Sequence, residues 1–566
     1  MANITIDGKK LQVKDGITII EAIDQAKLDL PRYCYHPGLS IAGNCRICQV
    51  EVENMPRTVI ACNTRVAEGM VIHTESAKAK ESQKVVLEFL LANHPLDCPV
   101  CDQAGECKLQ DYYMDYGLYD PLFNEMKVKK TKKAVSIGPT IMLDQERCVL
   151  CTRCIRFGDE ITHTHDFGIF NRGDHSEINI YPGSELNNKY SGNVADICPV
   201  GALTDKDFRF KMRVWYLGEG DSICPGCSRG CNIEVHYEKS RPYHLKDKRV
   251  MRLKPRENQN VNQWWICDNG RYDYKFIDEN RILEIKTTEL SMTESTNGSG
   301  DDLFWDKAIQ ATAKALKATS SWAVLLSSKY TNEELYLMKK IFKDHLQVKD
   351  FAFRSAQELG DEDEFLIRRD KTPNTNGLLQ FFTLPDDPKA MEALLQKLGQ
   401  GSHQGLFVFN HDLEAIIGAD ALRNLRQKVK TIIFEGSNHT STSRISDITL
   451  PSSVYAEKEG TFTNVQGRVQ RLYRVLQPLG KSRPTWKILT DLGKALGLGH
   501  TYDKASAIFD ELAKDTPAFN NLSHQSIGKQ GAPWALNYDA SVPRHCQSKG
   551  PSSCSSHKPV TSNNPS

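Results

Sequence analysis

The residues of this sequence with the clearest chemical potential are its cysteines, which fall into spaced groups. There are 17, of which 15 precede residue 268 and none lies between residues 268 and 545. A disulfide framework is typical of small secreted chains, whereas this chain has 566 residues. The distribution therefore predicts metal sites in the first half and a cysteine-free globular second half. We interpret Cys546 and Cys554, which lie in a tail rich in Ser and Pro, as free surface thiols.

The first group consists of Cys34, Cys45, Cys48 and Cys62. Four thiolates from one loop and one later position can hold a [2Fe–2S] cluster. Gly38 and Gly43 lie in that loop, and glycine allows backbone N–H groups to fold around the negatively charged sulfides. Structural zinc is the alternative, although zinc sites more often pair two CxxC motifs and this group has only one.

The second group offers three cysteines and one histidine: His94, Cys98, Cys101 and Cys107. His94 stands four residues before a CxxC pair, which favours it as the fourth ligand of a [4Fe–4S] cluster. A neutral imidazole in place of an anionic thiolate is expected to raise the reduction potential of that cluster. A zinc site with one histidine and three cysteines is the alternative.

The third group consists of Cys148, Cys151, Cys154 and Cys198, and Pro199 follows the last of them. Cysteines at i, i+3 and i+6 can surround one face of a cubane, so this group predicts a [4Fe–4S] cluster. Bacterial two-cluster ferredoxins carry the motif twice. The positions that would hold the second cluster are occupied here by Gly158, Asn188, Ser191 and Val194. We interpret the segment as a two-cluster module that has lost one complete site.

The fourth group consists of Cys224, Cys227, Cys231 and Cys267, with 35 residues before the last member. It fits a third [4Fe–4S] cluster, with zinc as the alternative. Together the four groups use 15 cysteines and one histidine within about 235 residues. Serial sites of this kind favour electron transfer, because electron tunnelling decays steeply with distance and needs closely spaced centres.

These motifs, in this order, resemble the large iron–sulfur subunit of bacterial NADH:quinone oxidoreductase (respiratory complex I), the 75-kDa type, over residues 1–500. The resemblance implies that the four groups bind, in order, the binuclear cluster, the His-ligated cubane, the cubane on the main route and an extra cubane off that route. It also implies a partner subunit that binds NADH and FMN, and further iron–sulfur partners on the quinone side. The chain itself would have no catalytic residue and would lie peripherally on the cytoplasmic side of the inner membrane.

The elements that position these groups are predicted from periodicity. Residues 4–13 alternate around Asp7-Gly8 as a hairpin, Thr18 and Glu21 form a capping box before a helix over 19–28, and 49–53 reads as a strand. An amphipathic helix over 81–93 leads to His94. Beyond residue 320, strands at 322–326, 406–409 and 431–434 alternate with helices at 333–345 and 418–428, which predicts a parallel sheet.

The second half is similar to the molybdopterin oxidoreductase fold, most clearly over Asp447–Gln470. We interpret it as an inherited scaffold without a molybdenum cofactor, because it is short and lacks cysteine. The expected fold is multidomain α+β. Its predicted domains are a β-grasp [2Fe–2S] module at 1–78, a His-ligated module at 79–120, a ferredoxin-like module at 139–218, a fourth cluster module at 219–275, a truncated α/β domain at 276–500 and a C-terminal extension at 501–566 whose last part is disordered.

Composition excludes several other classes. The formal net charge is +1, which is unlike a nucleic-acid binder. No apolar stretch is long enough for a transmembrane helix, and the chain opens directly into strand-like sequence, so we expect neither a signal peptide nor a presequence. Neither G-x-G-x-x-G nor a P-loop is present, which predicts that NADH binds a partner.

Three alternatives compete with the complex I reading. The large subunit of an NAD-linked formate dehydrogenase should keep both ferredoxin clusters, as should iron-only hydrogenase, and the lost second site argues against both. The diaphorase subunit of an NAD-reducing hydrogenase shares the first three groups but should end near residue 240. A non-redox zinc scaffold remains separable by metal analysis.

Overall fold

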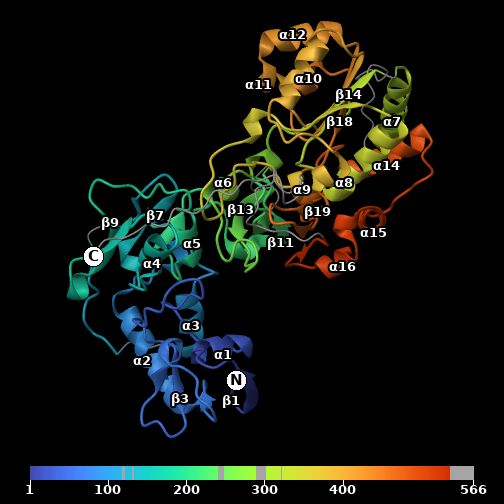
Figure 1. Cartoon of the computed structure of the whole chain (residues 1–566). Helices are drawn as coiled ribbons and strands as arrows, with labels where there is room; N and C mark the ends of the chain where they lie inside the picture. Colours follow the sequence, from blue (N-terminus) through green and yellow to red (C-terminus); the bar gives the residue numbers. More distant parts are fainter. Residues whose placement is uncertain (118–121, 131–132, 240–247, 288–300, 320, 536–566) are drawn as a thin grey trace, which may run out of the picture. The chain divides into compact units, whose positions relative to one another are not determined.

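The structure is a computed structural model, and it describes residues 1–117, 122–130, 133–239, 248–287, 301–319 and 321–535 (Figure 1). The chain divides into two compact units. The first unit contains residues 1–226, 231–281 and 364–367, and the second contains residues 227–230, 282–363 and 368–566. The tail from about residue 545, which the sequence predicts to be disordered, lies outside the described residues.

The first unit begins with a five-stranded sheet in the order β2-β1-β5-β3-β4. Its elements are β1 (Ala2–Ile6), β2 (Lys9–Val13), β3 (Gln49–Val52), β4 (Val59–Ile60), β5 (Val71–His73) and helix α1 (Ile19–Gln25). The predicted hairpin is confirmed, with Asp7 and Gly8 at positive φ in its two-residue turn. The capping box of Thr18 and Glu21 also forms. The apolar face of α1 shares one core with the sheet.

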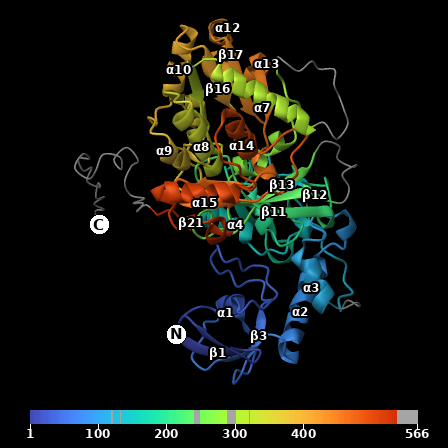
Figure 2. The ribbon, with the colours of Figure 1, turned by 90° about the vertical axis from the view of Figure 1, so that its right-hand side faces the viewer.

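Helix α2 (Ala77–Asn93) lies along β3, where the Gln83 side chain donates to the Gln49 carbonyl at 2.8 Å (Figure 2). The helix starts four residues before the predicted position because Ser76 caps it, accepting from the Ala79 N–H. It ends at its C-cap, His94, which is thereby presented next to the second cysteine group.

The middle of the first unit is built from short elements. They are α3 (Lys108–Tyr116), β6 (Val135–Ser136), β7 (Ile141–Leu143), α4 (Arg153–Glu160), β8 (Phe167–Phe170), β9 (Glu177–Ile180), α5 (Asn193–Ile197) and β10 (Leu203–Asp205). Strands β10, β7 and β6 form one antiparallel sheet, and β8 pairs with β9. A further antiparallel sheet follows, made of β11 (Leu217–Ile223), β12 (Asn232–Glu238) and β13 (Val250–Pro255), and then α6 (Asp268–Tyr272).

The second unit is organised on a five-stranded parallel sheet in the order β15-β14-β16-β17-β18, as the alternating pattern predicts. Its strands are β14 (Trp322–Leu325), β15 (Asp350–Ala352), β16 (Gly405–Phe409), β17 (Thr431–Gly436) and β18 (Ile448–Pro451). Successive side chains along a strand enter different cores: Val324 and Phe407 join one, and Leu325 and Leu406 the other. Both faces are therefore buried, as expected for a parallel sheet.

Helices cover the two faces. The face with Val324 packs on α7 (Asp301–Lys317), α8 (Asn332–Met338), α9 (Thr375–Phe381), α14 (Thr485–Leu496) and α15 (Ala505–Asp515). The other face packs on α10 (Ala390–Gly399), α11 (Leu413–Ile417) and α12 (Ala419–Lys428) (Figures 1 and 2). The predicted helix over 333–345 is realised as α8 followed by a π-helical segment, Lys339–His345. The remaining elements are α13 (Ser441–Ile445), β19 (Gly460–Thr463), β20 (Arg468–Leu472), α16 (His524–Ile527) and β21 (Ala532–Pro533).

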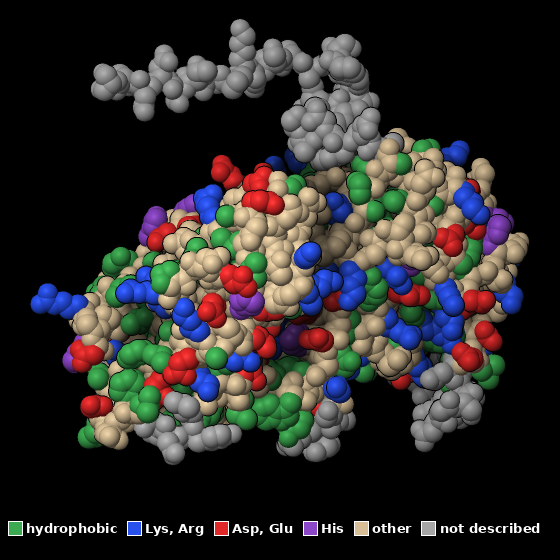
Figure 3. All heavy atoms as spheres, turned by 90° about the horizontal axis from the view of Figure 1, so that it is seen from below, with side chains coloured by type: hydrophobic (Ala, Val, Ile, Leu, Met, Phe, Trp, Pro, Cys, Tyr) green, Lys and Arg blue, Asp and Glu red, His purple; other side chains and the backbone are tan. Residues whose placement is uncertain are grey.

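The surface carries both signs of charge. Lys and Arg side chains are interspersed with Asp and Glu over the face in Figure 3, which agrees with the formal net charge of +1. Among the described residues, no helix combines the length and apolar character needed to cross a bilayer.

Candidate iron–sulfur centres

The thiols of the first group lie within hydrogen-bonding reach of one another. Cys34 interacts with Cys45 and Cys62, and Cys62 also interacts with Cys48. The hydrogen bond from Cys45 is the largest of the effects that lower the pKa of Cys34, and the one from Cys62 lowers the pKa of Cys48. The four sulfurs therefore share protons in a small, largely buried space, which suits a group that binds thiolates.

The loop geometry explains how this convergence arises. Arg46, between Cys45 and Cys48, has φ of +60°, and Gly43 has φ of +62°. Left-handed residues of this kind reverse the chain and direct successive N–H groups to one side. Gly38 has a different role from the one predicted: its N–H donates to His36 Nδ1, and a Cβ there would meet the ring of Trp264 at 2.5 Å.

The second group gathers around the end of α2. Cys98 is exposed, whereas Cys101 and Cys107 are buried. The Nδ1 atom of His94 is buried and makes no hydrogen bond within the described part of the chain. Burial lowers the pKa of His94 to about 4, so the imidazole is neutral at pH 7. A neutral ring with an unpartnered nitrogen has the chemistry of a metal ligand.

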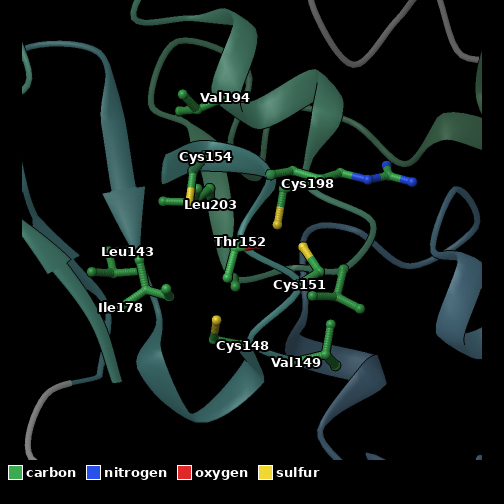
Figure 4. A pocket seen from close by; sticks show the side chains of 13 residues that line it. Leu143, Cys148, Val149, Cys151, Thr152, Cys154, Ile178, Val194, Cys198 and Leu203 are labelled. Carbon is green, nitrogen blue, oxygen red and sulfur yellow. The ribbon is translucent and has the colours of Figure 1, made fainter. Parts of the chain in front are cut away.

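The third group lines one cavity together with apolar side chains (Figure 4). The sulfur atoms of Cys148, Cys151, Cys154 and Cys198 all point into this space. Leu150 and Thr152, with φ of +53° and +61°, turn the loop so that its three thiols face inward. Burial raises the pKa of every thiol in the group, that of Cys198 to about 12. Iron binding here must therefore displace protons.

The positions of the lost second cluster are held by hydrogen bonds and apolar contact. Asn188 donates to the Asp166 carboxylate at 2.8 Å, and the Ser191 hydroxyl donates to Asp268 at 2.6 Å. The carbonyl of Gly158 accepts from the Thr164 N–H at 2.9 Å. Val194 lines the cavity of the third group. This part of the molecule therefore presents thiols to one space only, as the motif spacing of two-cluster ferredoxins predicts.

Three members of the fourth group lie in the first unit. The Cys224 N–H donates to the Cys231 carbonyl at 2.8 Å. A Cβ on Gly270 would lie 3.1 Å from the sulfur of Cys224 and 3.4 Å from that of Cys267, so these two thiols approach the same glycine. Although Cys267 follows a long spacer, the structure thus returns it to Cys224. Cys227 belongs to residues 227–230, which are grouped with the second unit.

Family models match five stretches of the chain. They are described as "2Fe-2S iron-sulfur cluster binding domain" (1–77), "NADH-ubiquinone oxidoreductase-G iron-sulfur binding region" (83–121), "NADH-quinone oxidoreductase subunit 3, ferredoxin-like domain" (138–204), "Molybdopterin oxidoreductase Fe4S4 domain" (219–279) and "Molybdopterin oxidoreductase" (374–495).

Relatives match over nearly the full length. The "NADH-ubiquinone oxidoreductase 78 kDa subunit, mitochondrial" of Candida albicans is 30% identical over 91% of this chain and 85% of that protein. The "NADH-ubiquinone oxidoreductase 75 kDa subunit" of Reclinomonas americana is 30% identical over 91% of each chain. The chain belongs to this family. A bacterial relative, the G-type NADH-quinone oxidoreductase chain of Rickettsia bellii, is 28% identical over 92% of this chain and 90% of its own length.

Among solved structures, the "NAD+-reducing [NiFe]-hydrogenase in the H2-reduced state" is similar, with a TM-score of 0.35 and 27% identity over 38% of this chain and 91% of that chain. Membership of the 75 kDa family agrees with the resemblance drawn from the cysteine spacing. The coarse fold expectation is also met, because [2Fe–2S], [4Fe–4S] and molybdopterin-oxidoreductase domains all match a mixed α/β structure.

Motif spacing did not indicate the charged residues that hold these loops. Arg147 pairs with Asp97, and the Arg213 guanidinium donates to the carbonyls of Cys101 and Pro99. Glu106, next to Cys107, pairs with Arg252 at 2.7 Å. Basic residues beside cysteine motifs were a visible signal, but their partners lie far away in the sequence.

Proposed function

We propose that this chain is an electron-transfer subunit of the peripheral arm of NADH:quinone oxidoreductase. Electrons would arrive from a partner that binds NADH and FMN and leave toward quinone. The observation that carries this proposal is the convergence of Cys148, Cys151, Cys154 and Cys198 on one buried cavity, inside a segment that matches the family's ferredoxin-like domain (Figure 4).

Four clusters are proposed, one [2Fe–2S] and three [4Fe–4S]. Their ligands are Cys34, Cys45, Cys48 and Cys62; His94, Cys98, Cys101 and Cys107; Cys148, Cys151, Cys154 and Cys198; and Cys224, Cys227, Cys231 and Cys267. When bound, an iron–sulfur cluster supplies reversible one-electron chemistry. The residues of the chain hold each cluster, keep water from it and direct N–H groups at its sulfurs.

The differing environments support distinct roles for the sites. Apolar side chains such as Leu143, Val194 and Leu203 surround the third cavity, and a dry shell of this kind changes the cost of adding charge. At the second group, neutral His94 replaces one anionic thiolate, which favours the reduced state. Neither site requires a catalytic acid or base.

The partners follow from the family. Other complex I subunits are expected, including the NADH- and FMN-binding subunit and the iron–sulfur subunits on the quinone side. Exposed apolar residues beside Cys98 support a docking role, since Leu96 is 77% and Val100 61% exposed. We place the chain peripherally at the cytoplasmic side of the bacterial inner membrane, held there through these partners.

Metal analysis combined with low-temperature EPR tests the proposal. The anaerobically purified chain should contain about fourteen iron atoms and no molybdenum, with one binuclear and several cubane signals after dithionite reduction. Stoichiometric molybdenum would instead indicate an enzyme of the formate dehydrogenase class, and zinc without iron would refute electron transfer. In the assembled complex, Cys151→Ala should interrupt electron flow from NADH to quinone, whereas normal flow would contradict a main-route position.

A further inference from the structure

Two arginines at the start of α4 contact the ligand loops of both the first and the third group. Arg156 donates from Nη2 to the carbonyl oxygen of Cys34 at 2.6 Å and to that of Cys151 at 3.1 Å. Its Nη1 donates to the carbonyl of Ser40. One guanidinium thus hydrogen-bonds the backbone of a proposed ligand from each site, although Cys34 and Cys151 are more than a hundred residues apart.

Arg153, one turn earlier, repeats the arrangement. Its Nη2 donates to the carbonyl of Tyr35 at 2.5 Å and its Nη1 to the carbonyl of Ile197 at 2.9 Å. Tyr35 follows Cys34, and Ile197 precedes Cys198. Arg153 therefore connects the same two loops at a second point, on the other side of the motif.

The third nitrogen of Arg153 has a different environment. Nε is buried and makes no hydrogen bond within the described chain, although the side chain lines the cavity into which the four thiols point. A buried N–H donor without an acceptor costs free energy, so such groups usually face a partner that occupies the site. A sulfide or thiolate sulfur of a bound cluster is an acceptor of the required kind.

We propose that Arg153 and Arg156 are positioning residues that join the [2Fe–2S] site to the third site, and that Arg153 also donates a hydrogen bond to the sulfur of the bound cubane. The inference rests on the proposed function, since it assumes that both sites hold clusters. The two hydrogen-bonded bridges hold the ligand loops at a set separation and provide short bonded connections between them.

The chemistry of arginine suits this task. The planar guanidinium presents five donors in rigid directions, so it can bind separate carbonyls at once, whereas a lysine ammonium is a single charged point. A fixed positive charge and an N–H···S hydrogen bond both stabilise the more negative, reduced cluster and so raise its reduction potential. Arg153 and Arg156 together would tune the third site upward and keep the first site coupled to it.

The test uses the assembled oxidoreductase with its full set of clusters. The variants are Arg153→Lys and Arg156→Lys, which retain the charge but lose the forked geometry, and the control is Arg172→Lys at an exposed position of the same unit. Two readouts are taken by EPR: the midpoint potential of each cluster in a dithionite titration, and the relaxation enhancement that the cubane causes in the binuclear signal.

We expect both variants to keep their iron. Arg153→Lys should shift the potential of the third cluster downward, Arg156→Lys should weaken the relaxation enhancement of the binuclear signal, and the control should match the wild type. Unchanged potentials and relaxation in iron-replete variants would overturn the inference. Loss of iron from the first or third site in both variants would also overturn it, because the arginines would then serve folding alone.

The outcome is separable from a failure of the proposed function. If NADH reduces none of the clusters in the wild-type complex, the assignment to electron transfer from NADH fails. The dithionite titration still reports the potentials, so the arginine inference is tested in either case.

Discussion

The guanidinium of Arg147 forms a two-pronged ion pair with Asp97, with Nε–Oδ1 at 3.1 Å and Nη2–Oδ2 at 2.7 Å. Arg147 immediately precedes Cys148, and Asp97 immediately precedes Cys98. The side chains are only 4% and 20% exposed. One ion pair thus holds the loop of the second group against the loop of the third.

Removing one partner of this pair should destabilise the loops, because the remaining carboxylate loses its partner in a poorly hydrated place. We expect Arg147→Met to lower local stability by about 3 kcal/mol. The double variant Arg147→Met/Asp97→Asn should recover part of that loss. Hydrogen exchange of peptides covering 97–101 and 145–151 measures the change. Arg423→Met, which breaks an exposed pair with Asp420, is the control and should have little effect; equal effects would contradict the role of burial.

Gly201 is predicted to be indispensable for the second site. A Cβ at this position would overlap the sulfur of Cys101 and lie 3.2 Å from the Cβ of Gln103. Gly201→Ala should therefore displace that thiol, costing about 1–3 kcal/mol and removing or altering the EPR signal of the His-ligated cluster. Gly499→Ala is the matched control, because nothing lies within 4 Å of its added Cβ. An unaltered second signal in Gly201→Ala would mean that Cys101 does not bind iron.

Replacing His94 by cysteine should lower the reduction potential of the second cluster. The imidazole is neutral, whereas a thiolate adds a negative charge beside the iron. EPR-monitored redox titration of the assembled complex gives the potential, and iron analysis shows whether the cluster is retained. His500→Cys, at an exposed position, serves as the control. A potential equal to that of the wild type in iron-replete His94→Cys would rule out His94 as a ligand.

Cys267 is expected to complete the fourth cluster, since its sulfur and that of Cys224 both approach Gly270. Cys267→Ala should reduce the iron content by about four atoms per chain and leave the other EPR signals in place. Cys546→Ala, which lies outside the four groups, should lose no iron. Full iron content in Cys267→Ala would place the fourth ligand elsewhere.

Glu435 should make the second unit less stable as pH rises. It is buried, accepts from the Thr485 hydroxyl at 2.7 Å and from Tyr330, and burial raises its pKa from about 4.5 to about 7. The folded protein therefore binds a proton more tightly than the unfolded chain. The stabilisation is complete below pH 4.5 and is lost as pH rises through 7, by on the order of 3 kcal/mol.

Hydrogen exchange of the β17 amides, measured from pH 5 to pH 8 and corrected for intrinsic rates, gives this dependence. Glu435→Gln should flatten it, since an amide does not titrate. The exposed Glu414→Gln variant should keep the wild-type slope. A flat profile in the wild type would show that Glu435 is ionised throughout.

Much of the second unit was predictable because its signals are local. The strands at 322–326, 406–409 and 431–434 are continuous apolar runs, and such runs separated by helical patterns are typical of a parallel sheet. The π-helical segment Lys339–His345 was not predictable from periodicity, since it depends on how α8 packs.

The sequence by itself determined which residues are candidate ligands. Short cysteine spacings oblige neighbouring thiols to lie close together, and the absence of thiols at Gly158, Asn188, Ser191 and Val194 removes one complete site. These are statements about a few consecutive residues, where covalent geometry leaves little freedom.

Only the tertiary structure decided how the groups are held. The contact of Gly201 with Cys101, the pairing of Arg147 with Asp97 and the bridges from Arg156 join residues separated by 50 to more than 100 positions. Over such separations the chain can adopt many arrangements, and the choice among them depends on the packing of whole elements. Spacing therefore determines the ligands, and packing determines their distances and the donors that surround them.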